Sequence, residues 1–281
     1  MSRQQSQRLA KILITIGAAI AVIPIVIVIT FLIINGIRAI SWTFLTQPPT
    51  NGMTEGGIMP AILGTILLTL GTAIAAIPLG VGAAIYLAEY AKETRLTRMI
   101  RLAIVNLAGI PSIVYGLFGL GVFVLFLDMG TSIIAGSLTL GIMTLPVVIS
   151  TSEEAILAVP QEFRLVSLSL GASQWQTIRR QVLPQAFPGI ITGIILGLGR
   201  AAGETAPILF TVAAFYLPQL PRSIFDQTMA LPYHLYVIST QVPGMPLDIQ
   251  YGTALVLLFF VLSMTLAASI LRTIMRRRRE W

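Results

Sequence analysis

Two side chains of opposite charge lie in the stretch GLGRAAGETAPILF, residues 197–210, which is otherwise apolar or small. Arg200 and Glu204 are four residues apart, so on a helix they project from the same side and can neutralise each other. A guanidinium is also a planar fork of donors that matches the oxygens of an oxyanion. Two interpretations stay open: a structural pair that satisfies itself or ties two helices together, or a charged point on the route of an anion.

Few other residue types could support chemistry. The chain contains no cysteine and one histidine, His234, so we expect no thiolate or histidine metal site and no cofactor. We expect His234 to be a hydrogen-bonded polar group rather than a ligand. An enzyme that used Glu204 as a base would need a second catalytic group at the same depth, and the neighbouring sequence offers no histidine, cysteine or aspartate. The phosphate-binding pattern G-x-x-x-x-G-K-[ST] is also missing, so we expect no ATPase site of its own.

The composition places these residues in a membrane protein. Hydrophobic residues make up 56% of the chain, charged residues 10%, and the mean hydropathy is +0.88, which is too apolar for an ordinary soluble domain. Six apolar runs are each long enough to cross about 30 Å of hydrocarbon as a helix. They are residues 12–34, 61–88, 102–127, 133–152, 188–214 and 251–271. The sequence therefore predicts an all-α integral membrane protein with six transmembrane helices, the first of them a retained anchor.

The basic residues predict the orientation. All but Arg38, Arg200 and Arg222 of the 18 Lys and Arg residues lie at the two ends of the chain or in two of the connections between spans. The positive-inside rule then places both termini and these connections in the cytoplasm. The formal net charge of +7 is explained in the same way, because the basic residues flank helices and face anionic headgroups. We therefore expect membrane lipid, and no nucleic acid, as a partner.

The connection between the fourth and fifth spans, residues 153–187, is longer than a turn between helices needs. Its pattern predicts two short amphipathic helices with a glycine corner at Gly171. An S-x-x-Q capping box at Ser173 begins the second helix, Pro184 ends it, and Pro188 opens the next span. Such a hairpin suits docking into a groove on a cytoplasmic partner, and it equally suits lying flat at the headgroups.

The stretch LVSLSLGASQWQTIRRQVLP resembles the EAA loop of ABC importer permeases, which reads E-A-A, three residues, Gly, nine residues, I-x-L-P. Gly171, Leu183 and Pro184 match at the family spacing. The chain departs from the pattern at Leu165, Val166 and Ser167, where Glu-Ala-Ala is expected, and at Gln181. The resemblance implies a coupling loop that docks on an ATPase through Gly171, Ala172, Ser173, Trp175, Leu183 and Pro184.

Three further stretches, NLAGIPSIVYGLFGLGVF, GRAAGETAPILFTVAAF and MALPYHLYVIST, resemble PstA-type permeases of phosphate-specific ABC importers. The similarity covers about residue 60 to the end of the last span. It implies a type I, MetI-like permease in the cell (inner) membrane that forms half of a phosphate path, with Arg200, Glu204 and Thr205 lining it. The implied partners are a PstC-type permease, a PstB-type ATPase dimer and a PstS-type binding protein. A permease for another oxyanion or small solute is the alternative.

The same reasoning divides the chain into three parts. Residues 1–60 form an anchor helix and an outer segment, residues 61–272 form the importer domain with its coupling loop at 153–187, and residues 273–281 form a basic cytoplasmic tail. Within the fifth span, small residues at intervals of four predict faces on which another helix can approach closely. These residues are Gly189, Gly193 and Gly197, and also Gly199 and Gly203.

Overall fold

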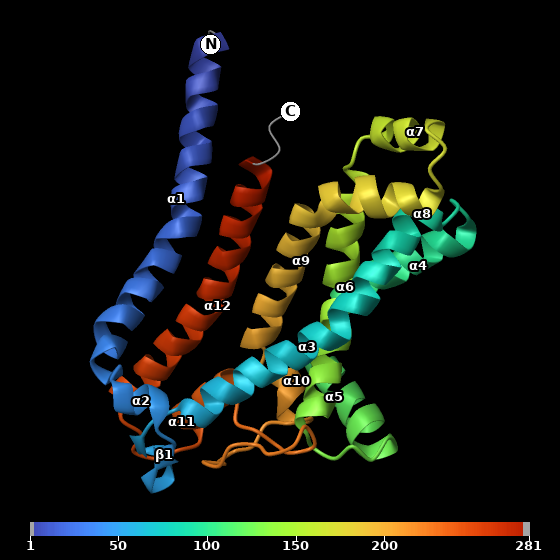
Figure 1. The fold of residues 1–281 in the computed structure, drawn as a ribbon. Helices are drawn as coiled ribbons and strands as arrows, with labels where there is room; N and C mark the ends of the chain where they lie inside the picture. Colours follow the sequence, from blue (N-terminus) through green and yellow to red (C-terminus); the bar gives the residue numbers. More distant parts are fainter. Residues whose placement is uncertain (1–2, 278–281) are drawn as a thin grey trace.

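The computed structural model describes residues 3–277 and is a bundle of long helices (Figure 1). Five helical stretches in the described chain are long and apolar enough to cross a membrane, in agreement with the predicted all-α membrane fold. They contain α1 (Arg3–Gly36), α3 (Met59–Ile85), α6 (Ile133–Leu157), α9 (Leu183–Gly203) and α12 (Leu247–Arg277). The beginning of α1 and the end of α12 lie at the same end of the bundle (Figure 1).

The third predicted span, residues 102–127, is not one straight helix. It is split between α4 (Arg95–Ala108) and α5 (Ser112–Gly119), with π-helical η4 (Leu120–Phe126) continuing α5, and the two halves bend by 100°. The break comes at Pro111, which has no N–H to donate and disfavours a helical conformation in the residue before it. The Tyr115 hydroxyl donates to the Leu107 carbonyl across the bend at 2.7 Å and so satisfies an acceptor near the end of α4.

Helices α3, α6 and α9 form the centre of the bundle, and α9 lies between α6 and α12 (Figure 1). The glycines of α9 explain how closely it packs, as predicted. On one side, Gly189, Gly193 and Gly197 face Ala155, Thr151 and Thr144 of α6; on the other, Gly199 and Gly203 face Thr265 and Val261 of α12. A β-carbon on Gly193 would collide with the Thr151 side chain, so the α6–α9 contact depends on small residues.

Helix α1 stands beside the bundle and contacts mainly α12 (Figure 1). Its apolar span is exposed along its length, and near its end Phe31, itself half exposed, packs edge-on against Tyr251 with ring centroids 5.4 Å apart. Gly36 also approaches the Tyr251 backbone too closely for any side chain. This contact at one end of α1 is consistent with an anchor helix within residues 1–60. The division of the chain into three parts stays a prediction.

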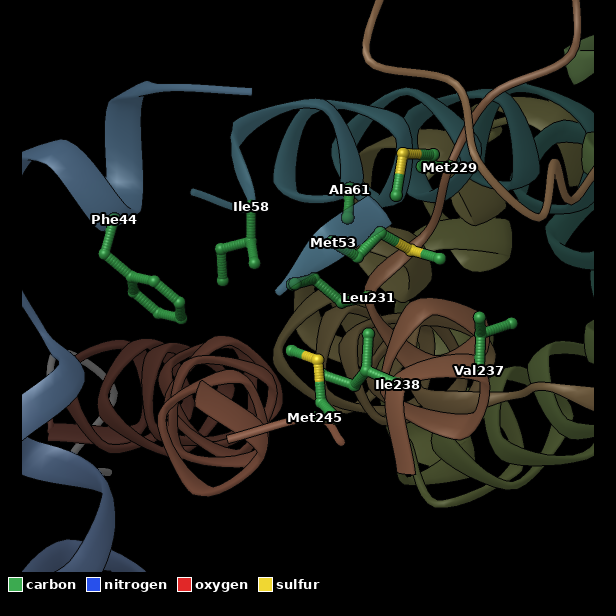
Figure 2. Close-up of a cluster of buried hydrophobic side chains, with 9 residues drawn as sticks. All are labelled: Phe44, Met53, Ile58, Ala61, Met229, Leu231, Val237, Ile238 and Met245. Atoms are coloured by element: carbon green, nitrogen blue, oxygen red, sulfur yellow. The ribbon is translucent and has the colours of Figure 1, made fainter. Parts of the chain in front are cut away.

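Two segments form a compact cap at the end of the bundle opposite the beginning of α1 and the end of α12 (Figure 1). The first contains η1 (Ile37–Ala39), α2 (Trp42–Thr46), η2 (Asn51–Met53) and the antiparallel strands β1 (Pro49–Thr50) and β2 (Glu55–Gly56). The second contains α11 (Leu231–Thr240). A buried cluster joins them, with Phe44 and Ile58 from the first segment packed near Leu231, Ile238 and Met245 from the second (Figure 2).

The connection between α6 and α9 is shorter than predicted, and its second helix does not end at Pro184. It contains α7 (Gln161–Ser169), α8 (Gln174–Thr177) and π-helical η5 (Ile178–Val182), and α8, η5 and α9 run on as one 30-residue helix, Gln174–Gly203. Pro184 lies in the first turn of α9, where a missing N–H is tolerated, directly after wider π-helical turns. The end of α3 is also π-helical, in η3 (Tyr86–Tyr90).

Candidate functional site

The Arg200–Glu204 pair forms, but the helix that carries it ends earlier than predicted. The predicted span of residues 188–214 stops at Gly203, and Glu204 has an extended backbone, with φ −77° and ψ 132°. A four-residue helix, α10 (Ala206–Leu209), follows the break with Pro207 in its first turn. Pro207 cannot donate to the Gly203 carbonyl and would clash with it in a continuous helix, which explains the break.

The two charged side chains contact each other, and neither is fully buried within this chain. Arg200 Nε lies 3.3 Å from Glu204 Oε1, and the side chains are 52% and 18% exposed, respectively. The buried face of α9, with Ala201 and Ala202, packs toward Thr65 and Leu68 of α3 around a cavity of only about 10 Å³. Arg200 lies on the other side of the helix, so its guanidinium faces an open surface.

Thr205, the third predicted path residue, follows Glu204 in the break. It is half-buried, and its carbonyl accepts from the Leu209 N–H at 3.2 Å, which starts α10. The structure therefore brings the three predicted path residues together at one interruption of the fifth span. Non-helical backbone within a membrane span is tolerated where it is buried in protein or lines a cavity.

His234 differs from its prediction. Its side chain is buried in α11, and within the described part of the chain its Nδ1 has no hydrogen-bond partner. Burial lowers the pKa of the imidazole to about 4, so the ring is neutral at pH 7. No group of three or more His, Asp or Glu side chains that could hold a metal ion gathers among residues 3–277.

The predicted coupling residues fall into two groups. Gly171, Ala172, Ser173 and Trp175 form the corner between α7 and α8, whereas Leu183 and Pro184 lie on the continuous helix about 12 Å farther along. Gly171 has φ +80°, and its N–H and that of Ala172 donate to carbonyls in the last turn of α7. The Ser173 side chain accepts from the Gln176 N–H, and the Gln176 side chain accepts from the Ser173 N–H, which completes the predicted capping box.

Helix α7 exposes an apolar surface at this end of the molecule. Leu165, Val166, Leu168 and Leu170 are exposed, Leu170 by 83%, and Trp175 is half exposed on the neighbouring helix. A hollow of about 440 Å³ lies beside α7 and is lined by Phe163, Val166, Leu170, Ala172 and Arg180, among others. Exposed apolar residues around a hollow are typical of a surface that binds another protein.

An ion pair that the sequence reasoning missed fixes α7 to the bundle. Arg164 at the start of α7 binds Glu89 at the end of α3, with Nη2–Oε1 at 2.7 Å and Nε–Oε1 at 3.1 Å, and both side chains are largely buried. The same guanidinium donates to the carbonyls of Ile156 at 2.9 Å and Val159 at 2.6 Å. Gln174 of α8 donates to the Glu89 carbonyl at 2.8 Å. We call these groups the Arg164 clamp, because they join α3, α6, α7 and α8.

A second cluster lies around Arg101 in the middle of α4. Arg101 Nε donates to Glu153 of α6 at 2.8 Å, its Nη2 donates to the Leu87 carbonyl, and its Nη1 pairs with Glu93. The hydrogen bond from Arg101 lowers the pKa of the Glu93 carboxyl. The pairs Arg164–Glu89 and Arg101–Glu153 each join residues from different helices, so no local pattern identifies them. The available signal is that acidic and basic residues flank several spans at the same predicted membrane face.

Comparisons with known proteins agree with this architecture. A family model described as "Binding-protein-dependent transport system inner membrane component" matches residues 76–281. A probable ABC transporter permease, YqgI of Bacillus subtilis, is 36% identical and covers 99% of both chains. The phosphate transport system permease PstA 1 of Mycobacterium tuberculosis (H37Rv) is 35% identical over 93% of this chain and 85% of its own.

A solved structure supports the fold independently of sequence. An inward-facing MetNI methionine ABC transporter matches with a TM-score of 0.64 over 78% of this chain and 95% of the other, at 15% identity. Several apolar spanning helices, the interrupted fifth span and the glycine corner thus occur in a chain that matches the family model over most of its length. This protein therefore belongs to the family of inner-membrane components of binding-protein-dependent transport systems, as a multi-pass permease subunit.

Proposed function

We propose that this chain is the permease subunit of an ATP-driven phosphate importer and forms half of the path through the membrane. The observation that carries the proposal is the Arg200–Glu204 pair at the break in α9, in which the half-exposed Arg200 guanidinium faces an open surface. The PstA relatives, about a third identical over most of the chain, support phosphate as the substrate. The chain is a transport component without its own ATPase site, and hydrolysis takes place on a separate subunit.

The path residues have complementary roles. A guanidinium replaces part of the water around a phosphate through its planar fork of donors. Glu204 keeps Arg200 paired when no anion is present and repels an anion that lingers. Binding at such a point has to stay weak, because a tight site within the membrane would trap its cargo. Arg200 lies on the side of α9 away from α3, so the second wall of the path comes from another subunit, a PstC-type permease.

The exposed apolar surface of α7 binds the ATPase, a PstB-type dimer, and the Arg164 clamp carries the motion of that dimer into α3 and α6. This assignment places α7, α8, the beginning of α1 and the end of α12 in the cytoplasm, in line with the distribution of basic residues. The cap formed by α2, β1, β2 and α11 then faces outward, where a PstS-type binding protein delivers the anion. Residues 61–272 act as the importer domain, and residues 1–60 anchor it.

Uptake of labelled anions tests the substrate. The chain is co-purified in mild detergent with its partner permease, ATPase and binding protein, each accompanying chain is identified, and the complex is reconstituted into vesicles. ATP-dependent entry of labelled phosphate is expected, with unlabelled phosphate competing strongly. If molybdate or sulfate enters and phosphate neither enters nor competes, the permease serves another oxyanion. If no ATPase accompanies the chain, the proposed role of α7 is wrong.

A further inference from the structure

A hollow of about 700 Å³ opens between α6, α9 and α12 at the same end of the molecule as α7. Its polar lining includes Thr151 and Glu154 of α6, Gln185 and Thr192 of α9, and Arg272 of α12. The lining of this hollow includes none of the three predicted path residues and no residue of α7. Its mixed polar lining distinguishes it from the apolar grooves that lipid chains fill.

The hollow lies directly along α9 from Arg200. Gly189, Gly193 and Leu196 line it, and they precede Arg200 by eleven, seven and four residues, which is the spacing of a single helix face. Leu196, the last of the three, is one turn from Arg200 and is itself exposed. The surface of α9 is therefore continuous from the Arg200 guanidinium into the hollow, over about 16 Å along the helix axis.

The packing of α12 explains why Arg272 reaches this place. Gly203 faces Val261 and Gly199 faces Thr265, so α9 and α12 run antiparallel with a fixed register. Continuing that register by seven residues sets Arg272 level with Thr192, about 12 Å along α9 from Arg200. Two arginines from different helices thus stand in sequence along one open surface.

The charges in the hollow favour a weakly held anion. Thr151 and Thr192 donate their hydroxyl hydrogens to carbonyls of their own helices, so Arg272 and Gln185 are the lining side chains left to donate to a ligand. Among the described residues, Arg272 forms no ion pair within 4.0 Å, and Glu154 is the acidic group that shares the hollow with it. The hollow repeats the combination of one arginine and one glutamate found at the break in α9.

We propose that this hollow is the inner vestibule of the anion path and that Arg272 is a second, transient contact for the oxyanion after it leaves Arg200. The inference rests on the proposed function. An exposed guanidinium in water holds an oxyanion weakly and draws it toward the cytoplasmic mouth without trapping it. Glu154 opposes accumulation there, so the anion continues into the cytoplasm.

The absence of cysteine allows a test that does not depend on transport. Thr192→Cys is introduced into the complete importer, and the rates of modification by anionic and cationic methanethiosulfonates are compared from the cytoplasmic side. With Arg272 present, the anionic reagent is favoured; Arg272→Gln is expected to slow it about fourfold, the effect of a unit charge about 5 Å away in water. Arg95→Gln, an exposed arginine of α4 outside the hollow, is the matched control and leaves the rates unchanged. Equal rates with and without Arg272, or no reaction at Cys-substituted Thr192, would overturn the proposal.

Transport separates this inference from the proposed function. In vesicles of uncharged lipid, Arg272→Gln is expected to lower the maximal rate of phosphate uptake several-fold while the stimulation of ATP hydrolysis by loaded binding protein persists. A defect that appears only in vesicles with anionic lipid would assign Arg272 to a lipid headgroup and overturn the vestibule. A wild-type complex that carries no phosphate refutes the proposed substrate, whereas a transporting wild type with an equally active Arg272→Gln variant refutes the vestibule alone.

Discussion

The guanidinium of Arg200 is held in a way that allows it to be released. Its partner is a single carboxylate at 3.3 Å, and half of its surface is exposed in this chain. Exposed ion pairs contribute about 0–1 kcal/mol in water. Arg200 also lies in the last turn of α9, where the helix dipole favours a cation without needing Glu204. An anion can therefore replace the glutamate at small cost.

Substitution of Arg200 distinguishes a role in the anion path from a structural role of the Arg200–Glu204 pair. Arg200→Gln is expected to abolish phosphate uptake, because the proposed path loses its charged contact for the anion, while the complex still assembles. Arg200→Lys keeps the charge but not the planar fork, so we expect it to retain part of the rate. Uptake into vesicles and recovery of the co-purified complex are the two measurements. Loss of assembly in Arg200→Gln would instead support the interpretation of Arg200 and Glu204 as a structural pair.

His234 makes the stability of the cap sensitive to acid. Its pKa is about 4 in the folded protein and 6.5 when exposed, so between these values the unfolded chain binds a proton that the folded chain does not. The contribution of neutral His234 to the free energy of unfolding is fully present above about pH 6.5. It is lost as the pH drops through 4, which lowers the free energy of unfolding by about 3 kcal/mol at most. Thermal unfolding in detergent at pH 7 and pH 4 measures the fall. The His234→Gln variant cannot titrate, and an unchanged pH dependence in it would show that other groups are responsible.

At the scale of the elements, the corner between α7 and α8 depends on one backbone angle. Gly171 has φ +80°, and no atom lies within 4 Å of the position a β-carbon would occupy, so any penalty comes from the backbone. Gly171→Ala is expected to destabilise the corner by about 1–2 kcal/mol. Gly171→Pro cannot adopt the angle and loses the N–H that donates to Leu168.

We expect Gly171→Pro to uncouple the importer, because the surface proposed to bind the ATPase is displaced. ATP hydrolysis should continue while phosphate uptake falls, and the ratio of the two rates is the quantity to measure. Gly171→Asn tolerates positive φ and serves as the conservative comparison. Normal uptake in the proline variant would contradict the docking assignment.

The Arg164 clamp makes a separate prediction at this scale. Glu89→Gln leaves Arg164 largely buried without its carboxylate, and breaking such a pair costs about 3–5 kcal/mol. Helix α7 should then move without carrying α3, so more ATP is hydrolysed per phosphate taken up. Glu93→Gln, which removes a more exposed carboxylate from the neighbouring cluster, is the matched control.

A double-mutant cycle checks that the two residues act together. The effect of combining Glu89→Gln with Arg164→Gln should be clearly smaller than the sum of the single effects, since each single change already removes the pair. Additive effects on the ratio of hydrolysis to uptake would show that Glu89 and Arg164 act independently.

Hydropathy and local motifs predicted most of this architecture because they act within one segment. The apolar spans, the glycine faces of α9 and the capping box at Ser173 depend only on neighbouring residues, and the structure contains them. Pro111 itself indicates a kink in its span, but the 100° size of the bend was not predicted, because an average over apolar residues carries no direction. The pairing of Arg164 with Glu89 was missed because the two residues are 75 positions apart and meet only in the folded bundle.

At the scale of the whole molecule, the arrangement of ends predicts a topology. Helices α7 and α8, the beginning of α1 and the end of α12 lie on one side, and the cap lies on the other (Figure 1). Since the chain has no cysteine, single substitutions can report each side. In intact cells an impermeant thiol reagent should label Glu55→Cys of the cap but not Ser169→Cys of α7, and inverted vesicles should give the reverse. Labelling of Ser169→Cys in intact cells would refute the orientation and the ATPase assignment together.

The open face of α9 has a consequence for the life of the protein in the cell. A copy that meets no partner presents Arg200 to lipid, where an arginine near the bilayer centre costs about 2.5–3.5 kcal/mol before its pairing with Glu204 lowers that cost. Such a copy is therefore less stable in the membrane than one assembled with its companion. The abundance of this subunit should therefore follow the supply of its companion. Synthesis of one without the other should produce short-lived subunits instead of stable unassembled ones.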